Sequence, residues 1–106
     1  MTDLHVINEF NNRLVNDYKP HKVILFGSYA NGTPGPDSDV DILVILPFEG
    51  KTTIKSAEIL NRINPRFPID LLVRTPEQVR DRLDKGDFFM REIMEKGVVL
   101  YETPDP

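Results

Sequence analysis

Four short apolar runs, each bounded by residues that interrupt regular structure, most constrain the fold of this 106-residue chain. A continuous apolar run of about four to eight residues between turn signals is typical of a buried β-strand. The segments are Val23–Phe26, which is continuously apolar, and Val40–Leu46, Ile69–Val73 and Val98–Tyr101, of which the first two each carry one aspartate, Asp41 and Asp70. We therefore predict four strands as the framework of the fold.

Helical patterns separate these runs. Apolar residues recur at helical spacing before the first strand and between the second and third, and Thr75-Pro76-Glu77-Gln78 has the form of a capping box that opens a helix. The predicted helices span about residues 3–17 and 51–63, a stretch from Thr75 onward, and residues 87–96, with a helical turn at 28–31. The predicted order is αβ(turn)βαβααβ, an α/β (α+β) chain that forms one domain over residues 1–106.

Two of these helices carry apolar groups whose burial can be anticipated. In the helix of residues 51–63, a set of side chains is expected to share one face: Ile54, Ala57, Leu60 and Ile63. In the last helix, a second set is expected in the core, although part of it could dock a partner: Phe88, Phe89, Ile93 and Met94.

Composition limits the function. The formal charge of −4 argues against an extended nucleic-acid surface, because phosphate backbones are held by clustered Lys and Arg. No apolar run approaches the roughly 18 residues of a membrane span, and the first residues lack the layout of a signal peptide. Zero cysteines exclude disulfides and thiolate metal sites. We therefore expect a cytoplasmic protein.

Three aspartates are candidates for chemistry. Asp39 and Asp41 are two positions apart at the start of the second strand, so their side chains should point to the same face, where they repel unless a cation separates them. Asp70 lies near the start of the third strand among apolar neighbours, where a carboxylate is costly unless it is paired or metal-bound. If these strands are neighbours, the three carboxylates converge. Oxygen-only ligands select hard cations such as Mg²⁺, and two such ions would serve an in-line displacement.

Gly27 and Ser28 supply a complementary feature at the end of the first strand. A glycine lets the backbone approach phosphates without a Cβ clash, and the N–H groups that begin a helix favour negative charge. Ser28 could add its hydroxyl group. Together with the aspartates, this turn indicates phosphoryl or nucleotidyl chemistry.

Each of these features also has a structural interpretation. Gly27-Ser28 can be an ordinary turn, the Asp37–Asp41 stretch a solvated loop, and Asp70 a partner of Arg74 or Arg66. Arg74 would share the face of Asp70 and could touch a phosphate, although a solvated arginine at a strand end is the simpler interpretation. The functional interpretation gains its strength from the combination of motifs.

Other phosphate and metal motifs do not fit these residues. A P-loop needs Gly-Lys-Ser/Thr, whereas Gly32 is followed by Thr33-Pro34, and the dinucleotide-binding fingerprint needs a second glycine at the position of Tyr29. A calcium-binding EF-hand loop that began at Asp37 would need glycine at its sixth position and glutamate at its twelfth. The chain has Ile42 and Phe48 there.

These motifs resemble those of the minimal nucleotidyltransferases of the polymerase-beta-like superfamily. The similarity spans about residues 22–102, and it rests on a defined set of residues: Gly27-Ser28, Ala30, Gly32, Ser38-Asp39-Val40-Asp41, Asp70 and the ending Gly97-Val98-Val99-Leu100-Tyr101. The resemblance implies a mixed β-sheet flanked by helices, the polymerase-beta-like palm. It also implies ATP or another nucleoside triphosphate as donor, and two Mg²⁺ ions.

The resemblance assigns roles to the candidate residues. Gly27 and Ser28 would hold the triphosphate, and Asp39 and Asp41 would bind both metal ions. Asp70 would assist the metal ion that activates the acceptor hydroxyl, as general base or as its positioner. One departure is Asn31, because many members carry a basic residue there and a neutral amide cannot replace a charged phosphate contact.

The family also implies a partner. Minimal forms of this size resemble the antitoxin of a two-component module whose toxin is a small helical HEPN-type protein, and some of these antitoxins adenylylate a tyrosine of the toxin. Two functions therefore remain open. The chain is either an active nucleotidyltransferase or a binding module that neutralises a partner without catalysis.

Overall fold

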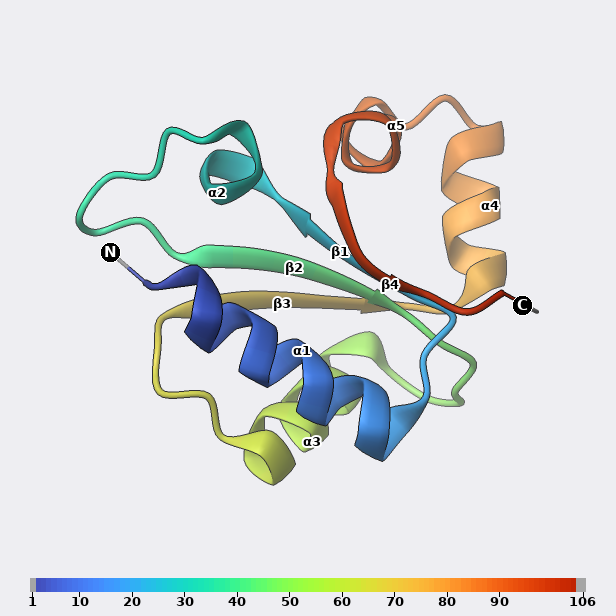
Figure 1. The fold of residues 1–106 in the computed structure, drawn as a ribbon. Helices are drawn as coiled ribbons and strands as arrows, with labels where there is room; N and C mark the ends of the chain where they lie inside the picture. The colour runs from blue at the N-terminus through green and yellow to red at the C-terminus, as the bar shows by residue number, and fades with distance from the viewer. Residues whose placement is uncertain (1, 105–106) are drawn as a thin grey trace.

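The computed structural model describes residues 2–104, and in this part of the chain helices cover both faces of a four-stranded sheet (Figure 1). The elements in chain order are α1 (Leu4–Tyr18), β1 (Lys22–Phe26), α2 (Gly27–Asn31), β2 (Val40–Ile45), α3 (Thr52–Ile63), β3 (Ile69–Arg74), α4 (Pro76–Asp84), α5 (Phe88–Lys96) and β4 (Val98–Glu102). The predicted order of elements is confirmed.

The sheet is mixed. Its strand order is β3-β2-β1-β4, in which β1 runs antiparallel to β2 and to β4, whereas β2 and β3 are parallel. Two parallel neighbours cannot be joined by a tight turn, so α3 forms the crossover between them. The predicted α+β class, a mixed sheet flanked by helices, is confirmed.

Successive side chains of a strand point to opposite faces, so the apolar residues of the strands are divided between the two faces of the sheet. Helices α1 and α3 pack on one face and α4 and α5 on the other (Figure 1). On the α4/α5 face, the buried cluster contains Ile24, Phe26, Leu43, Ile45, Val79, Met90 and Ile93. Because odd-numbered residues of β2 belong to this cluster, Asp41 also projects toward the α4/α5 side.

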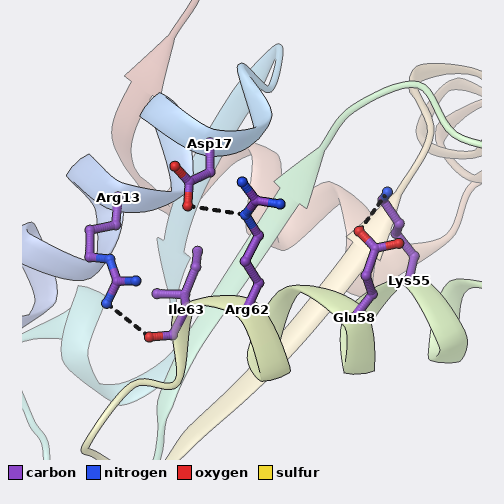
Figure 2. Close-up of polar contacts among 6 residues, drawn as sticks. All are labelled: Arg13, Asp17, Lys55, Glu58, Arg62 and Ile63. Carbon is purple, nitrogen blue, oxygen red and sulfur yellow. Dashed lines mark hydrogen bonds and ion pairs between the residues drawn. The ribbon is translucent and has the colours of Figure 1, made fainter.

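Polar contacts join α1 to α3 at the edge of their shared layer (Figure 2). Arg13 donates a hydrogen bond from Nη1 to the carbonyl oxygen of Ile63 at 3.0 Å, and Arg62 Nε lies 3.3 Å from Asp17 Oδ2. The hydrogen bond from Arg13 gives the Ile63 carbonyl a partner, because carbonyl groups in the last turn of a helix have none within the helix. The two helices are therefore linked at their surface as well as through the core.

The predicted buried face of α3 was wrong in part. Ile54 is 65% exposed and Ala57 is also exposed, whereas Ile59 and Ile63 are buried. Residues spaced by three drift around a helix of 3.6 residues per turn, so Ile54 and Ile63 end on opposite sides. The buried stripe follows the spacing of four between Ile59 and Ile63.

Within residues 2–104, the longest and most apolar helices still fall short of what is needed to cross a bilayer.

Candidate functional site

The turn after β1 is built around two glycines. Gly27 opens α2 with a φ of 72°, and Gly32 ends it with a φ of 75°. Both values lie in the left-handed region that glycine adopts most readily. No side chain caps the N-terminus of α2, so its first N–H groups are not used by a capping residue.

The aspartates are brought together by the sheet. Asp41 is paired with Asp70 in the ladder of β2 and β3, and with Phe26 in the ladder of β1 and β2. Asp39 precedes β2 by one residue. The structure therefore assembles a local motif and a distant residue at one end of three adjacent strands.

Gly27 and Asp41 are in direct contact. A Cβ atom added at Gly27 would collide with the carboxylate oxygen Oδ2 of Asp41 and would lie 3.2 Å from its Cγ. By contrast, a Cβ atom at Gly32 would meet nothing within 4 Å. The glycine at position 27 is thus required both by its backbone conformation and by the proximity of Asp41.

Asp41 is the carboxyl group that its surroundings perturb. Burial raises the pKa of Asp41, and the negative charges of Asp70 and Asp39 raise this pKa further. Asp39 and Asp70 are themselves exposed, whereas Asp41 is half-buried. The expectation that apolar surroundings bury Asp70 was wrong, because it lies on the edge strand β3 and its apolar neighbours Ile69 and Leu71 pack on the opposite face.

The ligand chemistry of this group suits Mg²⁺. Its donors are carboxylate oxygens only, and a cation would relieve both causes of the raised pKa of Asp41, the burial of its charge first and then the repulsion by Asp70 and Asp39. As they stand, no three Asp, Glu, His or Cys side chains in residues 2–104 form a ready metal cluster. Binding of an ion would therefore involve rotation of the carboxylates, two of which are exposed and free to move.

A cleft of about 240 Å³ opens beside Asp41, between α2 and α5. Its lining combines the α2 turn, the ends of β1 and β2, and one side of α5: Phe26, Gly27, Ala30, Asn31, Asp41, Phe89, Glu92, Ile93, Lys96 and Gly97. Gly27 and Asp41 thus belong to the cleft, whereas Ser28, Asp39 and Asp70 lie outside this lining. A pocket of this kind, lined by a carboxyl group whose pKa is raised by burial, is suited to a small ligand.

The contribution of α5 to the cleft was not predicted from the sequence. Phe89, Glu92 and Lys96 are distant from the motifs along the chain, and only the packing of α5 on β1 brings them near Gly27. The helix itself was predicted, but periodicity does not tell which part of the sheet a helix covers.

The core assignment for α5 was wrong for its first two residues. Phe88 is 76% exposed and Phe89 is 54% exposed, whereas Ile93 is buried as predicted. Met90 and Ile93, three positions apart, face the sheet, and Phe89 reaches it only through an edge contact with Phe26, with ring centroids 5.9 Å apart.

Arg74 takes no part in this site. Its Nη1 donates a hydrogen bond to the carbonyl oxygen of Val73 at 2.8 Å, at the far end of β3 from Asp70. In the described residues, neither Arg74 nor Arg66 forms an ion pair with Asp70. Arg74 is thus half-buried rather than fully solvated, and its contact with a phosphate stays a prediction.

Comparisons with known proteins agree with this geometry. The sequence is similar to the "Putative protein adenylyltransferase MJ0604" of Methanocaldococcus jannaschii, with 30% identity over 105 residues that cover 95% of this chain and 100% of that protein. Among solved structures, the fold is similar to that of a "putative nucleotidyltransferase" from Sulfolobus solfataricus, with a TM-score of 0.66 and 18% identity over 96% of this chain and 82% of that one.

A second solved structure is that of a toxin–antitoxin with AMP-PNP. It matches with a TM-score of 0.58 and 20% identity over 92% of this chain and 74% of that one, so the likeness shows the shared fold. The family model of the nucleotidyltransferase domain matches residues 7–100, which include the turn, all three aspartates and the cleft. This chain therefore belongs to the nucleotidyltransferase domain family.

Proposed function

We propose that this chain transfers a nucleoside monophosphate, AMP from ATP, to a hydroxyl group of a protein, with two Mg²⁺ ions. The observation that carries the proposal is the position of Asp41, which contacts Gly27 on one side and is paired with Asp70 on the other. The name of the M. jannaschii relative supports transfer of AMP to a protein, and the AMP-PNP in the toxin–antitoxin structure supports ATP as donor.

Some of the site residues would bind the donor nucleotide, and Asp70 would act on the acceptor hydroxyl. Gly27 and Ser28 would hold the triphosphate through the N–H groups at the start of α2, which no side chain caps, and Asp39 and Asp41 would hold both metal ions. Bound there, Mg²⁺ would supply positive charge that offsets the negative charge of the triphosphate during transfer. Asp70 would help to hold the metal ion on the acceptor side. The cleft beside Asp41 accommodates part of the nucleotide.

The reaction is an in-line displacement. The acceptor oxygen forms a bond to the α-phosphorus, and the bond from that phosphorus to the bridging oxygen breaks. Pyrophosphate leaves with the electron pair, and the hydroxyl proton passes to Asp70, either directly or through water. Asp70 is suited to this role because it is exposed beside Asp41 and accessible to an incoming protein.

We propose a tyrosine of a small helical HEPN-type toxin as the acceptor, with this chain as the antitoxin of the pair. The likeness to the toxin–antitoxin structure supports a toxin partner, by analogy of fold. The exposed Phe88 and Phe89 near the cleft offer apolar surface that a protein acceptor could contact.

The proposal is tested by label transfer. The chain is incubated with Mg²⁺, ATP labelled at the α-phosphate and a HEPN-type protein as the candidate acceptor, and the label on that protein is measured. Asp39→Asn and Asp41→Asn should each lower transfer about 100-fold or more. Asp37→Asn is the matched control, because Asp37 is exposed in the same loop and should leave transfer unchanged.

The binding-module alternative gives a different result. If the intact chain neutralises the toxin but never labels it, and the Asp39→Asn variant neutralises it equally well, the chain acts by complex formation and the enzymatic proposal is wrong.

A further inference from the structure

The cleft beside Asp41 is short of positive charge. Its lining contains two acidic side chains, Asp41 and Glu92, and Asn31 at the end of α2 is neutral. Of the residues that line it in the described part of the chain, Lys96 alone carries a cation. A triphosphate that enters this region meets carboxylates, so a cation that can reach its phosphate oxygens would offset part of this repulsion.

The backbone of Lys96 is held in place next to the Gly27-Ser28 turn. Lys96 is the last residue of α5, and a Cβ atom at the following Gly97 would collide with Ile24 and would lie 3.1 Å from the carbonyl oxygen of Leu25. This close approach fixes the end of α5 against β1, directly before Phe26 and Gly27. Only the side chain of Lys96 is therefore free to move.

The ammonium group has only a weak competing contact. Lys96 Nζ lies 3.8 Å from Glu92 Oε1, and the two side chains are 70% and 49% exposed. An exposed pair at this distance contributes little free energy, so the ammonium can turn toward a stronger anion at small cost. Lysine is a compact point charge on a flexible stem, which suits contact with phosphate oxygens from the side of a cleft.

We propose that Lys96 binds the phosphate tail of the donor nucleotide across the cleft and sets the affinity for ATP. This inference rests on the proposed function and deepens it, because it assigns to α5 a role in donor binding. Lys96 acts in binding rather than in the chemical step, so its loss should raise Kd and KM for ATP and leave kcat nearly unchanged.

The first experiment compares Lys96→Gln with Lys85→Gln by calorimetric titration with ATP and with AMP in the presence of Mg²⁺. Lys85 is a close match, because it is 72% exposed and also forms an i,i+4 pair, with Asp81, but lies outside the cleft. Lys96→Gln should weaken ATP binding about tenfold and AMP binding much less, whereas Lys85→Gln should change neither. Equal loss for AMP and ATP would overturn the assignment to the phosphate tail.

A rescue variant strengthens the test. Asn31 lines the same cleft from α2, so Asn31→Arg in the Lys96→Gln background should restore much of the ATP affinity from the opposite wall. The outcomes separate the two proposals. If the unaltered chain binds and transfers from ATP while Lys96→Gln behaves like Lys85→Gln, only the role of Lys96 is wrong. If the unaltered chain neither binds ATP nor transfers from it, the proposed function is wrong, and the role of Lys96 that rests on it is wrong as well.

Discussion

At the scale of single residues, Gly27 has the most constrained position in the site. Its φ of 72° disfavours any side chain, and the carboxylate of Asp41 occupies the space that a Cβ atom would need. These two requirements are physically separate. The first concerns the backbone conformation of Gly27, and the second concerns the distance between Gly27 and the carboxylate of Asp41.

Comparison of Gly27→Ala with Gly32→Ala separates these requirements. Gly32 has nearly the same φ but open space around it, so Gly32→Ala should cost about 1 kcal/mol of unfolding free energy and spare transfer. Gly27→Ala should cost more and should also abolish transfer, because Asp41 must move. Urea unfolding and the label-transfer assay provide the measurements. Equal effects of the two variants would show that contact with Asp41 is unimportant.

The sequence predicts the residues that come from local motifs. Gly27-Ser28 and the Asp39/Asp41 pair are recognisable because a turn and a strand impose fixed spacings, and Asp70 is found as a charge at the start of an apolar run. The exposure of Asp70 was missed, since a sequence does not reveal that β3 is an edge strand.

At the scale of elements, α5 forms a wall of the cleft and depends on its N-cap. Asp87 accepts a hydrogen bond from the backbone N–H of Met90 at 2.9 Å and pairs with Arg82 at 3.1 Å. The Met90 hydrogen bond, and next to it Arg82, lower the pKa of Asp87. Since the folded chain favours the ionised form, the stabilisation is present at neutral pH and is lost as the pH falls below about 4 through the lowered pKa.

Two substitutions test this cap. Asp87→Ala should lower the midpoint of urea unfolding at pH 7, and Asp87→Asn should lower it less, because an amide oxygen still caps the helix. At a pH below the lowered pKa, the difference between the unaltered chain and Asp87→Asn should shrink. A difference that is the same at both pH values would contradict an electrostatic contribution from Asp87.

The positions of the helices and strands along the chain were largely predictable, but the packing of each helix on the sheet was not. Capping signals and apolar runs located α4, α5 and the strands, because these signals are local. The exposure of Phe88 and the cleft residues of α5 depend on which part of the sheet the helix covers. That depends on contacts between distant segments of the chain.

At the scale of the whole molecule, placing the charge of Asp41 beside Asp39 and Asp70 lowers the free energy of unfolding. The pKa of Asp41 is raised by burial first and then by Asp70 and Asp39, so the folded chain holds the Asp41 proton more tightly than the unfolded chain does. The free energy of unfolding therefore falls as the pH rises from about 4 through the raised pKa of Asp41, and above that pKa the full loss of stability is present. The site lowers the stability of the fold that carries it.

Asp41→Asn tests this cost. In metal-free buffer at pH 7 the variant should unfold at a higher temperature than the unaltered chain, because the repulsion and the burial of charge are removed. The gain should disappear near pH 3, where Asp41 is protonated in both states. The same variant should lose transfer. A lower unfolding temperature at pH 7 would mean that ionised Asp41 stabilises the fold.

The parallel pairing of β2 with β3 has a consequence for the order of folding. The antiparallel β1 and β2 are close in sequence and can meet early, but β3 can join them only after the α3 crossover has closed a long loop. Asp70 therefore reaches Asp41 after Gly27 does. Nucleotide transfer then needs the β2–β3 pairing as well, so a chain in which only β1 and β2 have paired holds the Gly27-Ser28 turn beside Asp41 but lacks Asp70, the residue that we propose for the acceptor side.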